Sequence, residues 1–371
     1  SAASDVYKRQ IDMADINGTD LNLKKGTIAL DRALIDGGRV SLRMLEDSTS
    51  APVDTTASTP WNITAGDIEL RNITYTMEML PTIDSLGCDI PAARLRDATI
   101  DMGTRRIHGH SLSIDSVSAT YLTPSAEYLA SHPVTGTVKT DSTATDPSQM
   151  WAITADELRL TARRGTYAAA GATPMPGFDM NYIEVKDIVI EVDSFYNRGT
   201  SITVPLKRLS GTERCGLQLY ATGTFAMDSL SMRATDMAVS TLRSTIDFDA
   251  EMGMGDLTAD PSLPLSLKAD ARINLAEVKN TMPSVAPMLA VIPTAQEAIL
   301  KTDIAGTAGS IDVSQLLLQI PGLLRINGDG VIDNPMDFKR MEGNVTLSGE
   351  FASLNSVKKM LPPAIAKTIN I

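Results

Sequence analysis

Residues 67–78 read Asp-Ile-Glu-Leu-Arg-Asn-Ile-Thr-Tyr-Thr-Met-Glu, and this stretch decides the fold class. Apolar residues occupy every second position on both sides of Arg71-Asn72, which is a turn signal. Strict alternation places the apolar side chains on one face of a strand and the polar ones on the other. The stretch therefore predicts β-strands that are covered on one face and wet on the other.

The same alternation recurs along the chain. It is found at residues 40–44, 188–192, 217–219 and 246–248. Turn signals separate these runs about every 8–12 residues, as in a protein of many short strands. They include Gly37-Gly38, Gly103-Thr104 and residues 197–199, 253–255 and 327–330. We predict a mainly β fold in which an antiparallel sheet is built from roughly twenty short strands.

Composition excludes several classes of protein. The chain has 371 residues and a formal net charge of −12, from 33 Lys and Arg against 45 Asp and Glu. A nucleic-acid-binding protein needs a basic surface, so nucleic acid is not expected as a partner. Aromatic residues make up only 4% of the chain, which is few for stacking sugars or bases. No apolar run approaches the roughly 18 residues of a membrane-spanning helix.

The organisation of the chain follows from its loops and ends. Residues 1–10 match nothing that follows, so we expect a non-native segment and exclude it from the fold. Residues 11–371 are predicted to form one elongated, repetitive β domain. Ser, Thr, Asp, Pro or Gly-rich stretches predict loops at residues 46–60, 133–149 and 171–177. The sequence stops at Ile371 within an apolar pattern, so we expect it to be a fragment.

Two internal repeats are present. Trp61 and Trp151 each open a similar segment directly after one of the predicted loops, and we expect them to be equivalent structural corners at strand starts. A strand followed by a short helix is predicted at residues 263–283 and again at residues 343–362. The corresponding apolar residues are Leu275 and Val278 in the first copy and Leu354 and Val357 in the second. Repeats of this length favour a stacked, elongated architecture.

Residues for catalysis or metal binding cannot be assigned, and no cofactor is predicted. His108 and His110 would share one strand face, but no third metal ligand is marked, so a solvated hairpin explains them better. Asn274 and Glu277 form a plausible capping box for the first short helix. Cys88 and Cys215 lack a metal-binding spacing, and two separate thiols explain them better than a disulfide.

The apolar strand face must be covered by something, and the sequence offers only two convincing short helices to do so. Either the sheet folds over on itself, or part of this face stays open and forms an apolar groove, which marks a binding site. Acyl chains would suit such a groove, because each buried CH₂ contributes about 0.8 kcal/mol without directional contacts. The candidate groove residues are Ile188, Ile190, Val192, Leu217, Leu219, Ile246 and Phe248.

Residues 206–252 resemble the AsmA/TamB-like envelope proteins of Gram-negative bacteria, in the form found in Bacteroidetes. The resemblance rests on residues 206–210 (LKRLS), 213–219 (ERCGLQL), 223–225 (GTF) and 244–248 (STIDF). Cys215 stands where the family more often has Ser. The Trp-initiated and strand-helix repeats look like the same family, while the subfamily, AsmA or TamB, stays open.

The resemblance implies an elongated, curled, taco-like antiparallel sheet with a few short helices and an apolar inner groove. It implies a protein anchored in the inner membrane through an N-terminal segment absent from this sequence, and projecting across the periplasm. It also implies that phospholipid acyl chains pass along the groove toward the outer membrane, or that the protein assists outer-membrane assembly proteins. The family has no catalytic residues to carry over, so no enzyme is expected.

Other functions stay open on the sequence. One is a repetitive surface adhesin or glycan-binding protein, which a shallow aromatic-lined surface would indicate. Another is a purely structural β domain whose apolar face is closed. A β-helical polysaccharide-active enzyme would need carboxylates grouped with a cationic residue in a cleft, and the sequence does not display such a group.

Overall fold

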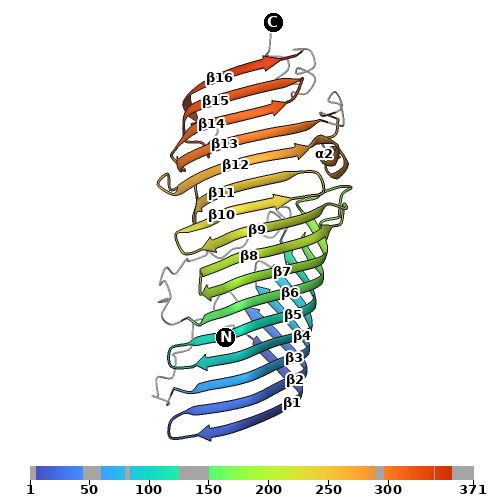
Figure 1. The fold of residues 1–371 in the computed structure, drawn as a ribbon, viewed down its shortest axis with the longest axis vertical. Helices are drawn as coiled ribbons and strands as arrows, with labels where there is room; N and C mark the ends of the chain where they lie inside the picture. The colour runs from blue at the N-terminus through green and yellow to red at the C-terminus, as the bar shows by residue number, and fades with distance from the viewer. Residues whose placement is uncertain are drawn as a thin grey trace, which may run out of the picture. The chain divides into compact units, whose positions relative to one another are not determined.

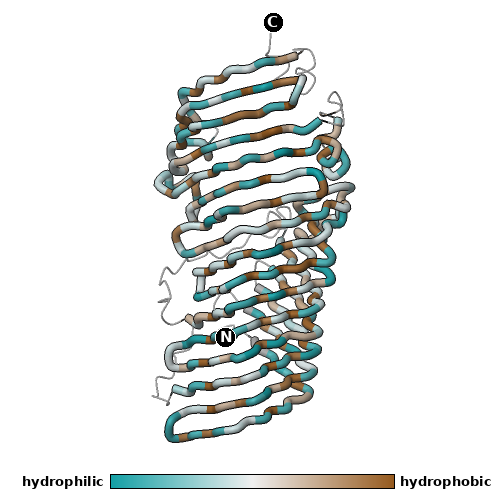
Figure 2. The backbone as a smooth tube through the Cα atoms, in the orientation of Figure 1, coloured by the Kyte–Doolittle hydropathy of each residue, from teal (hydrophilic) through white to brown (hydrophobic). Residues whose placement is uncertain are grey.

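The fold is mainly β, as the alternation predicts. The computed structural model describes residues 6–44, 60–79, 84–124, 150–283, 285–287, 289, 296–337 and 339–352. Within them lie sixteen strands, and the hydrogen-bonded order of the strands in the open sheet is the order of the chain. Apolar and polar residues alternate along the strands, as Figure 2 shows.

By their internal contacts the strands divide into two compact units. Unit 1 comprises residues 1–175 and 179–214, and unit 2 comprises residues 176–178 and 215–371. Residues 6–10, set aside above as a non-native segment, are the beginning of the first strand and pair with the second.

The described residues of unit 1 form eight strands, most of which are long. They are β1 (Val6–Asn22), β2 (Thr27–Met44), β3 (Asn62–Met79), β4 (Asp84–Asp101), β5 (Arg106–Thr123), β6 (Ala152–Ala169), β7 (Tyr182–Arg198) and β8 (Ser201–Glu213). The prediction of short strands is wrong here, because Gly37-Gly38 and Arg71-Asn72 lie inside β2 and β3 instead of between strands. Figure 1 shows the reason, since the long strands of unit 1 bend and continue behind themselves.

Two strand pairs of unit 1 are parallel, which the prediction of an antiparallel sheet did not include. β3 runs parallel to β2, and β6 runs parallel to β5. A parallel pair needs a crossover connection, and the predicted loops at residues 46–60 and 133–149 fall in these two connections, almost wholly outside the described residues. Trp61 and Trp151 directly precede β3 and β6, so the two Trp repeats are structurally equivalent strand starts.

Two lines of bends cross unit 1 perpendicular to its strands. At each line one residue per strand drops out of the pairing register, and several of these residues have positive φ. The first line is formed by Asp31, Gly66, Asp97, His110, Asp156 and Ser194. The second line is formed by Gly37, Asn72, Pro91, Ser116, Arg163 and Asp187. Gly, Asn and Asp accept positive φ most readily, and an extra residue of this kind bends a strand as a bulge does.

The bends also explain the spacing of apolar residues. In β2 the apolar face is formed by Ile28 and Leu30, then by Ala33 and Ile35, and then by Val40 and Leu42. An interval of three residues replaces the usual two at Asp31, and Gly37 breaks the alternation in the same way. The unpaired residue therefore restores the apolar side chains to the same face after each bend.

The described residues of unit 2 form eight shorter strands and one helix. They are β9 (Gln218–Met227), β10 (Ser231–Ser240), β11 (Thr245–Gly253), β12 (Pro264–Asn274), α2 (Leu275–Thr281), β13 (Glu297–Thr307), β14 (Ser310–Ile320), β15 (Leu324–Asp333) and β16 (Glu342–Phe351). The neighbouring strands from β9 to β16 all pair antiparallel. The turn predicted at residues 327–330 is wrong, because these residues lie inside β15.

The first strand-helix repeat is confirmed as β12 followed by α2. Asn274 caps the helix by accepting a hydrogen bond from the Glu277 backbone N–H at 3.1 Å. The reciprocal half of the predicted capping box is missing, because the Glu277 carboxylate instead accepts bonds from the Thr241 and Ser244 hydroxyls. Leu275 packs with Ile320 and Leu324 in a small core. In the second copy, residues 343–351 lie in β16, while Leu354 and Val357 lie outside the described residues.

Candidate functional site

The candidate site is the apolar face of unit 1, on which side chains from successive strands form rows. Between the two bend lines, one row consists of Ala33, Ile68, Leu95, Leu112, Leu158 and Val192. The next row consists of Ile35, Leu70, Ala93, Ile114, Leu160 and Ile190. Beyond the first bend line, Ile28, Ile63, Ile100, Ile107 and Ile153 form a row of one residue type. We call this surface the inner face.

Contacts across the bends show that the inner face lies on the inside of both. At the first bend line, a methyl group added at Gly109 would overlap Leu95 Cδ1, which belongs to the segment beyond the bend. At the second, a methyl group at Gly165 would lie 3.0 Å from Ile188 Cδ1. A methyl group at Gly211 would lie 2.6 Å from Val185 Cγ1 and 3.5 Å from Ile188 Cγ1, so side chains from both sides of Asp187 converge there. The apolar face is therefore concave, and glycine leaves room for these side chains in its corners.

The inner face is only partly covered. Its large side chains between the bends, such as Ile68, Leu112 and Ile190, are half-buried, whereas small residues beside the bends are nearly inaccessible. Ala98, for example, is 2% exposed. Side chains at the core of a closed sandwich would be fully buried. The described residues thus leave a concave apolar surface in contact with solvent, which is the arrangement that marks a binding face.

The structure places three of the predicted groove residues on the inner face. Ile188, Ile190 and Val192 lie together on β7, in register with Ala162, Leu160 and Leu158 of β6. Val192 is 3% exposed, while the other two are half-buried. Glu191 points to the opposite face, and Asp187 is an exposed bend residue.

The other predicted residues belong to unit 2. Ile246 and Phe248 share the apolar face of β11, where they pair with Ala271 and Ala269 of β12. Leu219 lies on the same face of β9 as Ala221. Ala221 pairs with Val239 of β10, and Val239 pairs with Ile246 of β11, so Leu219 and Ile246 belong to the same face of the sheet. Leu217 precedes β9 and is not a strand residue. One end of the apolar face of unit 2 is covered, because Leu275 of α2 packs there with Ile320 and Leu324, whereas Ile246 and Phe248 are half-buried.

The outer face of unit 1 between the bends is charged and internally paired. Arg94 binds Asp67 with two hydrogen bonds of 2.6 and 2.8 Å, and Glu69 contacts both Arg32 and Arg71. The hydrogen bond from Arg94 lowers the pKa of Asp67, and that from Arg71 lowers the pKa of Glu69. Charges paired across strands in this way leave the surface wet and close to neutral.

The histidines form a surface contact with one carboxylate. His110 Nδ1 lies 3.1 Å from Asp156 Oδ2, and His108 Nε2 lies 3.9 Å from Asp156 Oδ1. Both rings therefore lie on the same side of the sheet, although His110 is a bend residue that drops out of the pairing register. The described residues contain no group of three or more metal-ligating side chains. Cys88 and Cys215 are not joined by a disulfide, and burial raises the pKa of the Cys88 thiol.

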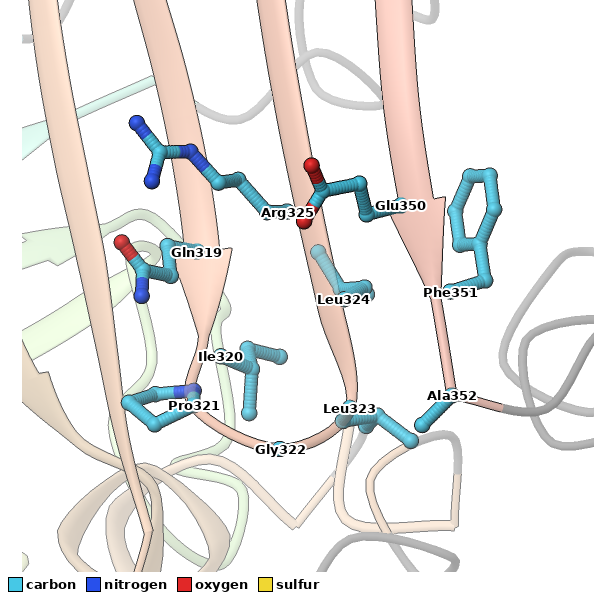
Figure 3. Close-up of a pocket in the computed structure, with 10 residues that line it drawn as sticks. All are labelled: Gln319, Ile320, Pro321, Gly322, Leu323, Leu324, Arg325, Glu350, Phe351 and Ala352. Carbon is cyan, nitrogen blue, oxygen red and sulfur yellow. The ribbon is translucent and has the colours of Figure 1, made fainter.

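A shallow pocket in unit 2 offers no chemistry of its own. It lies where β14, β15 and β16 end, around the turn at residues 321–323 (Figure 3). Arg325 and Glu350 are in register on neighbouring strands, and the Arg325 side chain extends away from Glu350 (Figure 3). A nucleophile with an adjacent base is not among the ten lining residues.

Comparison with known proteins leaves the family open. No protein-family model matches the chain, and no curated protein matches it significantly. Within the described part of the chain, no helix has the length and apolar character needed to span a bilayer.

Proposed function

We propose that this chain is a non-enzymatic envelope protein of the AsmA/TamB-like type, whose inner face binds and conducts phospholipid acyl chains. The observation that carries the proposal is the concave apolar face of unit 1, with rows of half-buried Ile and Leu between two bends. Acyl chains need apolar area and no directional partners, and each CH₂ removed from water contributes about 0.8 kcal/mol.

The dimensions of the inner face suit this ligand. Each row crosses six strands from β2 to β7, and strands spaced about 4.8 Å apart give a row of about 24 Å. One leaflet of a bilayer holds its acyl chains within about 15 Å, half of the hydrocarbon core. An acyl chain lying across the strands would therefore find apolar contacts along its whole length.

The cellular setting belongs to the same proposal and is supported by the sequence resemblance alone. The protein would act in the periplasm, held at the inner membrane through a segment that precedes this sequence. It would pass phospholipid to the outer membrane or assist outer-membrane assembly proteins.

Photo-crosslinking at adjacent positions of β7 tests the proposal. Benzoylphenylalanine is placed at Ile190 on the inner face or at Glu191 on the outer face, and the protein is expressed in the periplasm of a Gram-negative host. We expect lipid adducts from position 190 and none from position 191, because neighbouring residues point to opposite faces. Mass spectrometry of the adducts identifies the lipid.

A matched pair of charge variants provides the second readout. Ile190→Asp places an unpaired carboxylate among acyl chains and should abolish lipid co-purification, whereas Val189→Asp on the opposite face should not. Phe248→Asp with Gln218→Glu as its control extends the test to unit 2. If position 190 yields no adduct in a protein that circular dichroism shows to be folded, acyl-chain binding is refuted, and a structural β domain becomes the better account.

A further inference from the structure

The two rims of unit 1 differ in charge. One rim contains the turns at residues 23–26, 102–105 and 199–200 and the residues that directly precede β3 and β6. It also includes the three outermost residues of each strand at that edge. Backbone hydrogen bonds join its parts, from Asn62 N to Gly26 O at 2.8 Å, from Met102 N to Trp61 O at 2.9 Å and from Ala152 N to Arg105 O at 2.8 Å. We call this continuous edge the basic rim.

Five cationic residues lie on the basic rim, against two carboxylates. The cationic residues are Lys24, Lys25, Arg105, Arg106 and Arg198, and the carboxylates are Asp20 and Asp101. Asp101 is engaged in its own turn, where it accepts the Gly103 and Thr104 backbone N–H groups at 2.8 and 3.0 Å. A local excess of positive charge is unexpected in a chain with a net charge of −12.

The opposite rim has the reverse balance. At the strand ends and the turn between β6 and β7, its described residues include five carboxylates: Glu78, Asp84, Asp179, Glu184 and Glu213. The cationic residues there are Lys8, Arg43 and Arg214. Arg43 is paired with Glu78 at 2.8 Å. A negatively charged group approaching the inner face is therefore attracted to one rim and repelled by the other.

Amphipathic and apolar side chains accompany the cations. Trp61 and Trp151, the two tryptophans of the chain, both lie on the basic rim. Trp151 is 38% exposed, Leu23 70% and Met102 48%. Tryptophan beside Lys and Arg is the combination that proteins place at the headgroup level of a lipid layer.

We infer that the basic rim binds the phosphate headgroup of a phospholipid whose acyl chains lie on the inner face. This inference rests on the proposed function, and it adds which rim the headgroup occupies and which lipids are preferred. The inner face alone would accept any acyl chain, whereas the rim favours lipids that carry a net negative charge. Anionic phospholipids such as phosphatidylglycerol are thus the expected ligand class.

Binding of two tail-labelled lipids with different headgroups tests the inference. Phosphatidylglycerol and phosphatidylcholine with the same fluorescent acyl chain are titrated against the purified chain. We expect phosphatidylglycerol to bind roughly tenfold more tightly at low salt, since basic residues attract an anionic headgroup. The preference should vanish near 1 M salt, where the Debye length falls to about 3 Å.

Matched triple variants locate the effect. Lys24→Gln, Lys25→Gln and Arg106→Gln together should bring phosphatidylglycerol to the affinity of phosphatidylcholine and leave the latter unchanged. Arg39→Gln, Arg164→Gln and Arg243→Gln remove the same charge from exposed residues away from the basic rim and should keep the preference. Free glycerol phosphate in excess should not displace the lipid, because it lacks the acyl chains.

The outcomes separate the two proposals. Equal binding of both lipids by the unmodified chain overturns the headgroup inference and leaves acyl-chain binding standing. A preference that survives in the rim variant, or that is lost equally in both variants, also overturns it. Binding of neither lipid overturns the proposed function itself. Displacement by glycerol phosphate would also overturn the headgroup inference, because it would show a phosphate site that does not depend on lipid.

Discussion

His110 Nδ1 lies 3.1 Å from Asp156 Oδ2, and both residues stand at the same bend of two neighbouring parallel strands. Each is the residue that drops out of register at the first bend line, so the contact joins the bends of β5 and β6. Because neighbouring strands bend at the same place, the sheet of unit 1 turns along one line.

The contact with Asp156 should raise the pH at the midpoint of the His110 titration. The hydrogen bond raises the pKa of His110 above its ordinary value. Its stabilising contribution is therefore fully present below the unfolded-state pKa, about 6.5, and is lost as the pH rises through the folded-state pKa. NMR titration of the imidazole should show a higher midpoint than a model peptide, and Asp156→Asn should lower it. An unchanged midpoint in the variant would contradict the contact.

Position 72 should tolerate few residues other than Asn, because its backbone adopts a positive φ. Its φ is 54°, and its side-chain Nδ2 donates to Asp36 Oδ1 at 2.7 Å across the second bend line. Asn72→Val should reduce the free energy of unfolding by about 1–3 kcal/mol, because a β-branched residue is strained at positive φ. Asn72→Gly is the control, since glycine adopts this conformation freely and should cost much less. Denaturant unfolding of both variants measures the difference.

Ala98 should not tolerate a larger side chain. It lies beside the first bend on the inner face and is 2% exposed. Ala98→Leu should destabilise unit 1 by about 1–3 kcal/mol, because overpacking forces neighbours out of their rotamers. Ile28→Leu, at a half-buried position of the same face, should change stability by less than about 1.5 kcal/mol. Equal effects of the two substitutions would mean that the corner is not tightly packed.

Cys88 provides a reporter on the inner face. It lies in register with Tyr75 and Ala119, and burial raises the pKa of its thiol. In a Cys215→Ser background, alkylation of Cys88 should require higher pH than alkylation of a free cysteine, because only the thiolate reacts. Bound acyl chains should slow the reaction further. A rate equal to that of free cysteine would contradict the placement.

The cap of α2 should stabilise unit 2. Asn274→Ala removes the acceptor of the Glu277 backbone N–H and should cost about 1 kcal/mol. Leu275→Ala removes a side chain that is 5% exposed in the small core and should cost about 2–5 kcal/mol. Thermal unfolding of both variants should therefore show a clearly larger loss for Leu275→Ala.

The sequence predicts the apolar character of the candidate site but not its concave shape. Alternation assigned Ile188, Ile190 and Val192 to one apolar face, because side-chain direction in a strand depends only on sequence parity. The bends were missed, although the signal was present as a three-residue interval between apolar residues, for example from Leu70 to Ile73. Gly and Asn at positive φ serve both tight turns and bends, so Gly37-Gly38 and Arg71-Asn72 were interpreted as turns between short strands.

The sequence by itself determined the strand class, the apolar and polar faces and the equivalence of Trp61 and Trp151, because these depend on local patterns along one strand. Only the tertiary structure decided that the bends of neighbouring strands coincide and that the apolar face lies on their inner side. It also gathered Lys24, Lys25 and Arg106 on one rim, from turns far apart in the chain. Register between strands sets both features, and register is a property of the paired sheet that no single strand contains.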